Sequence, residues 1–346
     1  MDWLKNIPDN EVANMLVIDS DILIRLYNDK LSKDDALEFA YIGLTYKAHL
    51  CISAFTYFEF FKGITDDNEY EKRLKFLLKK TDGILSYGNI GLMDKINPEY
   101  WLDGKTFNVV EFKRFYSLLK DNVYSIIKKV LINLIDGITV ISLMVKGCLE
   151  KIDIKCWYAF AMASEKPDVT QSRLNILEKI IDKNFKDIFF DKKLSEQCID
   201  DMIKISLLLF NGKKEDPDKF VPTNFSEIKE FLLCKNEACS YVKSQNNINC
   251  KSCATFCKSF LEHLNRKNEK DIVFVGLCKL IIDYFNGRKV SSNDFIDLLN
   301  ISSIETGVPK TNTFYGTKEK YWNNEFIRKY AQDEDKIWKC TILEFN

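Results

Sequence analysis

Acidic side chains from separate stretches of the sequence follow or lie close to short apolar runs. Asp19 comes directly after the run MLVI, and Glu59 lies in ISAFTYFEFFKG. Asp294 and Asp297 lie three residues apart in SSNDFIDLLN, and Glu319 lies in FYGTKEKYW. Carboxylates crowded into one pocket repel one another unless a cation neutralises them, and the hard, oxygen-seeking Mg²⁺ or Mn²⁺ suits such ligands. A metal site of this kind activates water for in-line attack, so these residues point to phosphodiester hydrolysis.

Each acid also has a purely structural interpretation. Glu59 follows Thr56 by three residues and Asp294 follows Ser291 by three, and both pairs fit a capping box at a helix start. The acid of GTKEKYW lies in a charged segment, where solvated side chains are the norm. Asp19 is different, because apolar residues flank it on both sides, and holding its charge there requires compensation.

The elements expected to position these acids begin with two buried strands. The short apolar runs Met15–Ile18 and Leu50–Ser53 predict parallel strands, each leading into a helix, which places Glu59 in the first turn of the second helix. Between the strands, residues 31–47 predict a helix with one apolar face, formed by Leu37, Ala40, Tyr41 and Leu44. This β-α-β-α order favours a parallel sheet covered by helices, whose strands bind ligands at their carboxyl ends.

The rest of the chain divides into a helical middle and an α/β end. From about Tyr70 to Asn265 the periodicity is helical and no run demands a strand. Beyond it we expect a short helix from about Ser292 and two strands, at Asn312–Tyr315 and Trp338–Phe345. An α/β core split by a helical insertion is the simplest account of this order.

Two N-terminal motifs resemble those of a known family. VIDSDILIRL followed by ISAFTYFEFFKG resembles the first two motifs of PIN-domain ribonucleases, in which one strand ends in Asp and a second strand leads into a helix bearing Glu. NDFIDLLNISS resembles the third acidic motif, and GTKEKYW resembles the fourth, usually Thr-x-Asp after a strand. The resemblance covers about residues 12–65 and 270–345.

The resemblance implies a fold, a set of metal ligands and an activity. The implied fold is an α/β, PIN-like parallel sheet flanked by helices and interrupted by a mostly α-helical insertion, with core residues 1–90 and 269–346 and insertion residues 91–268. The family's metal-binding acids fall on Asp19, Glu59, Asp297 and Glu319, with Asp294 competing for the third position and Glu standing where the fourth motif usually has Asp. The implied activity is Mg²⁺- or Mn²⁺-dependent cleavage of RNA, often by a toxin or an antiviral-defence protein.

A cluster of cysteines offers a second metal site. Cys250 and Cys253 have the spacing of structural zinc ligands, and Cys234 with Cys239 would complete a tetrahedral Zn²⁺ site. The alternative is a buried helix face, because Cys250, Cys253 and Cys257 recur at helical spacing. With only two histidines in the chain, His49 and His263, and no catalytic partner near either, acid–base cleavage of RNA by histidine is disfavoured.

The charge balance limits how the chain can bind RNA. It carries 50 Lys plus Arg against 51 Asp plus Glu, which argues against a general polyanion binder and leaves room for a local basic groove. One helical stretch has basic residues at Lys113, Arg114, Lys120, Lys128 and Lys129, among aromatics at Phe112, Phe115, Tyr116 and Tyr124. These residues would contact RNA, or would form a core stripe with a solvated edge. A structured substrate such as a transfer RNA fits the lack of a large basic surface.

The remaining expectations concern location and partners. The first residues do not resemble a secretory signal, and the longest run without a basic residue, Val130–Val145, has 16 residues including Asp136 and predicts a buried helix. We therefore expect a cytoplasmic chain with no membrane partner. The insertion would bind RNA, a regulatory protein or a second copy of the chain. The alternative function is a non-catalytic PIN-like scaffold that binds RNA or protein through the insertion.

Overall fold

The computed structural model describes residues 13–85, 93–104, 106–149, 289–305, 311–317 and 340–344, together with Ile199, Met202 and Leu280. The chain clusters into two compact units, each discontinuous in sequence. The first contains Met1–Ile126, Lys270–Ile272 and Ile296–Asn346, and the second contains Ile127–Glu269 and Val273–Phe295. The domain bounds expected at residues 90 and 268 stay a prediction.

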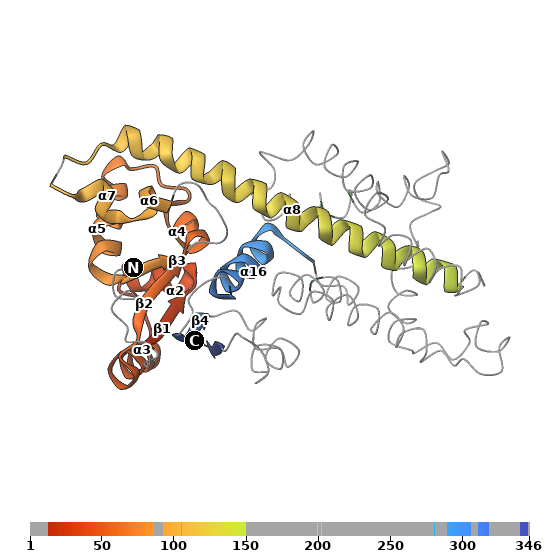
Figure 1. Ribbon diagram of the computed structural model, residues 1–346, viewed down its shortest axis with the longest axis horizontal. Coiled ribbons are helices and arrows are strands. Elements are labelled where there is room, and N and C mark those ends of the chain that lie inside the picture. The colour runs from red at the N-terminus through yellow and green to blue at the C-terminus, as the bar shows by residue number, and fades with distance from the viewer. Residues whose placement is uncertain are drawn as a thin grey trace. The chain divides into compact units, whose positions relative to one another are not determined.

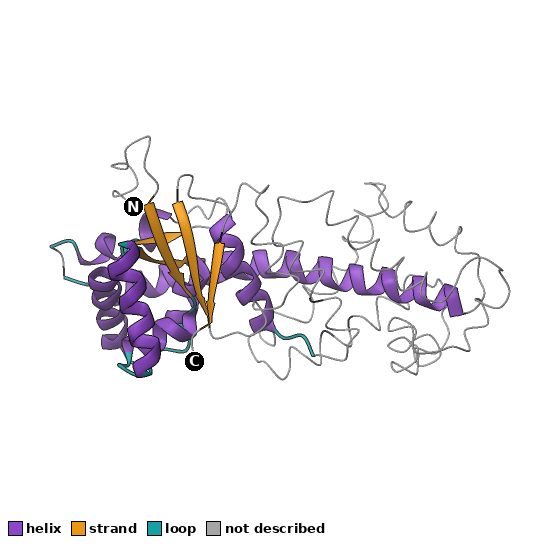
Figure 2. Cartoon of the chain, turned by 90° about the horizontal axis from the view of Figure 1, so that it is seen from below, coloured by secondary structure: helices purple, strands orange, loops and turns teal. Residues whose placement is uncertain are grey.

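A single parallel sheet forms the centre of the first unit (Figure 2). Its five strands are β1 (Ala13–Ile18), β2 (His49–Ser53), β3 (Gly83–Leu85), β4 (Thr311–Thr317) and β5 (Cys340–Glu344). They lie in the order β3-β2-β1-β4-β5, and every neighbouring pair is parallel. The coarse prediction of an α/β fold with a parallel sheet and flanking helices is confirmed.

The strands form where apolar runs are continuous. Met15 to Ile18 of β1 and Cys51 and Ile52 of β2 are buried, as expected for parallel strands covered on both faces. The expectation that residues from about Tyr70 to Asn265 are helical, with no run that demands a strand, missed β3. This strand is only three residues long and pairs with Cys51–Ser53, so its short sequence shows no strand periodicity.

Eight helices are described with their bounds, and side-chain caps set the starts of the first four. They are α2 (Ser20–Tyr27), α3 (Lys33–Tyr46), α4 (Ala54–Phe61), α5 (Asp67–Lys80), α6 (Met93–Ile96), α7 (Pro98–Leu102), α8 (Val109–Leu149) and α16 (Ser292–Glu305). The caps of α2 to α5 are Asp19, Ser32, Ser53 and Asp66, each accepting a backbone N–H from the first turn. Because α4 begins at Ala54, Glu59 lies in its second turn, and its predicted place in the first turn is wrong.

The core of the first unit is aromatic and is centred on α4, which lies between the strands and the N-terminal part of α8 (Figure 1). Phe58 stacks on Tyr116, whose hydroxyl donates a hydrogen bond to the Phe58 carbonyl at 2.9 Å. Phe61 packs against Phe112. On the solvent side of α8, Lys113 pairs with Asp67. The interpretation of Phe112, Phe115 and Tyr116 as a stripe that packs in the core is therefore confirmed.

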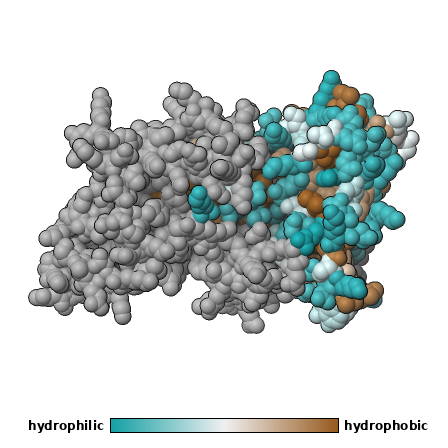
Figure 3. Space-filling view, turned by 180° about the vertical axis from the view of Figure 1, so that it is seen from behind, coloured by the Kyte–Doolittle hydropathy of each residue, from teal (hydrophilic) through white to brown (hydrophobic). Residues whose placement is uncertain are grey.

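The apolar face of helix α3 identified from the sequence is exposed to solvent. Leu37, Tyr41 and Leu44 are 69%, 59% and 81% exposed, whereas Ile42 is 3% exposed. Figure 3, which views the molecule from behind, shows apolar side chains at its lower right edge, and this edge corresponds to the lower left of Figure 1, where α3 lies. The predicted apolar face exists in the sequence but is not buried, because the tertiary contacts of α3 are made by the opposite side, which carries Ile42 and the buried Asp35.

Leu44 and Ile42 therefore make a matched pair for stability measurements. We expect Leu44→Gln to change the free energy of unfolding by less than about 0.5 kcal/mol, because the side chain is already in water. Ile42→Ala should destabilise the chain by about 2–4 kcal/mol, because it removes buried methyl groups and leaves a cavity. Urea denaturation of both variants beside the wild type checks this expectation. A larger loss from Leu44→Gln than from Ile42→Ala would contradict the orientation of α3.

The apolar run Val130–Val145 lies within α8. Its described side chains include Val130, Leu131 and Ile135, all buried, in line with the expected buried helix. None of the helices described here combines the length and hydropathy that crossing a bilayer requires.

Candidate functional site

The candidate site lies at the carboxyl edge of the sheet, around the end of β1. The chain places β2 on one side of β1 and β4 on the other, so β1 and β4 flank the point where the strand order reverses. Crevices at such points, outside the carboxyl ends of the strands, are where open α/β sheets bind ligands. Asp19 directly follows β1, and its N–H donates to the Gly316 carbonyl at 3.1 Å. Asp19 therefore lies beside Thr317, the last residue of β4.

The Asp19 carboxylate is held at the start of α2. It is 4% exposed, and its Oδ1 accepts a hydrogen bond from the Ile22 N–H at 3.0 Å. Ile18 and Ile22 beside it are fully buried, so the apolar surroundings inferred from the sequence are present. The positive end of the helix dipole and this N–H supply the compensation that a buried charge requires.

Glu59 faces α2 from the second turn of α4. Its Oε2 accepts a hydrogen bond from the Ser20 hydroxyl at 2.5 Å, which links the helices that follow β1 and β2. Burial raises the pKa of Glu59 above its ordinary value, and the charges of Asp19 and Asp21 raise the pKa further, while the Ser20 hydrogen bond and Lys62 lower it. The Ser20 hydrogen bond therefore joins Glu59 to the chain next to Asp19, and the charge of Asp19 is one of the smaller influences on Glu59.

This donor set fits a hard divalent cation. Mg²⁺ in proteins is commonly held by one or two carboxylates, with water filling the other positions. Glu59 is disfavoured in its charged form by burial and by Asp19, so a cation between the two acids would relieve both effects. Within the part of the chain that the structure describes, no group of three or more His, Cys, Asp or Glu side chains converges on a metal position. The structure therefore brings Asp19 and Glu59 into one region but does not bring the described Asp294 or Asp297 together with them in a metal-holding group, so a third ligand stays a prediction.

Helix α16 carries the two candidates for that third acid. Asp294 Oδ2 accepts hydrogen bonds from the Ser291 N–H at 2.7 Å and the Ser291 hydroxyl at 3.0 Å, the contacts of the capping box. Asp297 lies one turn further on and three residues before Asn300, so these two share a face of the helix. Asn300 Oδ1 accepts a hydrogen bond from the Ser53 hydroxyl at 2.5 Å at the end of β2. Asp294 is thus occupied as a cap, and Asp297 stays the predicted third acid, although the structure does not group it with Asp19 and Glu59.

Other predicted ligands lie outside the described residues. These are the fourth acid, Glu319, and the four cysteines of the zinc prediction, Cys234, Cys239, Cys250 and Cys253. Glu319 follows the end of β4 by two residues, and β4 ends beside Asp19. The Glu319 assignment and the zinc site both stay predictions.

Two residues of this region were not singled out from the sequence. Ser20, which binds Glu59, directly follows Asp19 and could have been noticed as a hydroxyl at the same strand end. Asn300 interrupts a series of buried apolar residues in α16 (Ile296, Leu298, Leu299 and Ile301). A polar residue within such a series was the available indication.

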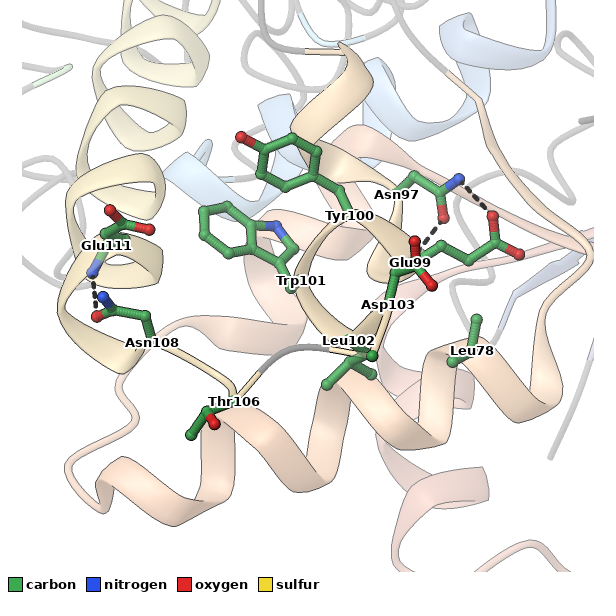
Figure 4. Close-up of a pocket in the computed structure, with 11 residues that line it drawn as sticks. Leu78, Asn97, Glu99, Tyr100, Trp101, Leu102, Asp103, Thr106, Asn108 and Glu111 are labelled. Atoms are coloured by element: carbon green, nitrogen blue, oxygen red, sulfur yellow. Dashed lines mark hydrogen bonds between the residues drawn. The ribbon is translucent and has the colours of Figure 1, made fainter.

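A separate hollow of about 780 Å³ lies among α5, α7 and the first turn of α8 (Figure 4). Its lining includes Leu78, Tyr100 and Trp101, with the acids Glu99 and Glu111. The Trp101 indole N–H donates to the Lys95 carbonyl at 2.6 Å, so a hydrogen bond between α7 and α6 holds the ring in place. None of the predicted site residues lines this hollow.

Comparison with known proteins adds no relative to this picture. No protein-family model, no curated protein and no solved structure matches the chain. The resemblance to PIN-domain ribonucleases therefore stays a prediction, and the geometry around Asp19 and Glu59 is the basis for inferring a function.

Proposed function

We propose that the chain is a divalent-metal-dependent endoribonuclease that hydrolyses RNA phosphodiester bonds at the carboxyl edge of its sheet. The observation that carries the proposal is geometric: Asp19 ends β1 at the reversal of strand order, and the hydroxyl of the adjacent Ser20 binds the Glu59 carboxylate on the helix after β2. The motif resemblance to PIN-domain ribonucleases supports it, because the first two motifs supply these two acids.

The acids have distinct roles in this proposal. Asp19 and Asp297 would hold Mg²⁺ or Mn²⁺ directly, Glu59 would hold the ion or a water on it, and Glu319 would support a second ion. When bound, the cation lowers the pKa of water and stabilises the charge that develops on the phosphate.

The surrounding residues prepare Glu59 for proton transfer. The hydroxyl of Ser20 fixes one carboxylate oxygen, which leaves the other to accept a hydrogen bond from the attacking water. Burial, and to a smaller extent the charge of Asp19, raises the pKa of Glu59 in the metal-free chain, so it takes up a proton more readily than an ordinary glutamate does. Asp19 is kept in place by the first turn of α2, so its orientation needs no rearrangement when substrate arrives.

The test is a cleavage assay with the purified chain. Labelled total RNA, transfer RNA and single-stranded DNA are incubated with Mn²⁺, with Mg²⁺ or with a chelator. We expect internal cuts in RNA that require the metal, and the transfer RNA arm shows whether a structured substrate is preferred. Intact RNA under every condition, from a chain that is folded by circular dichroism, would count against the enzyme and favour the alternative function.

That alternative is a non-catalytic scaffold with the same fold, and one observation offers it a binding surface on α3, outside the predicted insertion. The exposed stripe of α3 (Leu37, Tyr41 and Leu44) is apolar surface of the kind that contacts other macromolecules. If the chain is such a scaffold, Asp19→Asn should leave binding unchanged, and no preparation should cleave RNA.

A further inference from the structure

A buried polar cluster lies next to the candidate site and takes no direct part in it. It consists of Ser53, Thr56 and Asn300, all fully buried. Asn300 Oδ1 accepts hydrogen bonds from the Ser53 hydroxyl at 2.5 Å and from the Thr56 hydroxyl at 3.2 Å. Ser53 and Asn300 are 247 residues apart in the chain, so this cluster joins distant segments.

The cluster touches the segments that carry three of the four proposed acids, Asp19, Glu59 and Asp297. Ser53 is the last residue of β2 and the N-cap of α4, where it accepts the Thr56 N–H at 2.9 Å, and α4 carries Glu59. Thr56 Oγ1 lies 3.4 Å from the Ile18 carbonyl oxygen, a second acceptor for the same hydroxyl, and Ile18 immediately precedes Asp19. Asn300 belongs to α16, which carries Asp297.

Asn300 is also placed where stability alone would favour an apolar residue. Its neighbours Ile296, Leu299 and Ile301 are fully buried, and its Nδ2 is buried with no hydrogen-bond partner among the described residues. A buried donor left unpaired is destabilising, and an apolar side chain of the same size avoids that penalty. Polar residues that break a local rule in this way are expected at sites under functional constraint.

We propose that Asn300 is a positioning residue for the metal site, and this inference rests on the proposed function. Through Ser53 and Thr56 it fixes α16 against the ends of β1 and β2. Asp297 lies three residues earlier on the same helix, about 4.5 Å along its axis. Locking Asn300 therefore sets the position of Asp297 relative to Asp19 and Glu59, as supporting hydrogen bonds orient metal ligands elsewhere.

The experiment measures Mn²⁺ binding to the full chain without RNA, from the electron paramagnetic resonance of the free ion, together with thermal unfolding. Asn300→Leu keeps the volume and removes the acceptor, and Thr56→Val keeps the shape and removes one donor. Thr56→Ser retains the hydroxyl and is the matched control. We expect the dissociation constant for Mn²⁺ to rise more than about tenfold in the first two variants and to stay within about twofold in the control. The unfolding midpoint of Asn300→Leu should change little, because the unpaired Nδ2 is removed while the Ser53 hydroxyl keeps Thr56 Oγ1 and the Thr56 hydroxyl keeps the Ile18 carbonyl as acceptors.

The outcomes separate this inference from the proposed function. Wild-type affinity for Mn²⁺ in both Asn300→Leu and Thr56→Val would overturn the positioning role alone, provided that Asp19→Asn weakens binding. If Asn300→Leu fails to fold, Thr56→Val against Thr56→Ser decides the question. A wild-type chain that binds no Mn²⁺, or binds it equally well with Asn at position 19, would overturn the proposed function and this inference together.

Discussion

Replacing Asp19 by Asn should abolish metal-dependent RNA cleavage while the chain stays folded. Asn is as good an N-cap as Asp, so the hydrogen bond that Asp19 Oδ1 accepts from the Ile22 N–H can persist and α2 keeps its start. The charge is lost, and with it a direct ligand of the proposed cation. Loss of an outer contact of a metal site commonly lowers activity about 10- to 100-fold, so loss of a direct ligand should lower kcat/KM by more than about 100-fold.

Asp66 provides the matched control for this substitution. It is the N-cap of α5, is exposed, and accepts the Asn68 N–H at 3.0 Å, so Asp66→Asn makes the same chemical change at the same kind of position. Cleavage rates and unfolding midpoints of both variants are measured beside the wild type. We expect Asp66→Asn to retain cleavage within about twofold. Equal losses in the two variants would mean that Asp19 acts through the helix cap and not through a metal.

Local sequence patterns predicted every strand of the sheet except β3, but they did not predict which face of α3 is buried. The continuous apolar runs at Met15–Ile18 and Leu50–Ser53 could be recognised because both faces of a parallel strand are buried. The stripe of Leu37 and Leu44 in α3 has the correct helical period, but periodicity alone does not decide whether a face meets the sheet or the solvent. That choice depends on which residues the sheet can accommodate, which only the tertiary structure shows.

The site was predictable where it depends on neighbours in the chain and unpredictable where it depends on distant ones. Asp19 could be placed because it ends a strand. The start of α4 was misplaced because Ser53 and Thr56 are both plausible caps, and only the end of β2 shows that Ser53 is the cap. The contact between Ser53 and Asn300 spans 247 residues, and no local pattern encodes it.

Glu59→Gln should abolish cleavage and at the same time stabilise the folded chain at neutral pH. Gln can still accept the Ser20 hydrogen bond, but it neither binds a cation as an anion nor takes up a proton, so kcat should fall by about 100-fold or more. Burial, with Asp19 and Asp21, raises the pKa of Glu59 in the folded state above its unfolded value. The folded chain then binds the proton more tightly, and wild-type stability falls as pH rises through the folded pKa. The higher stability of Glu59→Gln relative to the wild type should therefore be absent below the unfolded pKa of Glu59 and present at pH 7.

The pKa of Glu69 is lowered where that of Glu59 is raised, so Glu69→Gln is the matched control for Glu59→Gln. Burial alone would raise the pKa of Glu69, but hydrogen bonds from Arg73 and Tyr27 and the charge of Arg73 outweigh it and lower the pKa. A carboxylate with a lowered pKa contributes stability above its unfolded pKa and loses it as pH falls through the folded pKa. Glu69→Gln should thus destabilise the chain at pH 7, converge with the wild type in acid, and leave kcat unchanged. Unfolding midpoints of both variants between pH 4 and pH 7 test the pair, and shifts of the same sign would mean that Glu59 is an ordinary surface carboxylate.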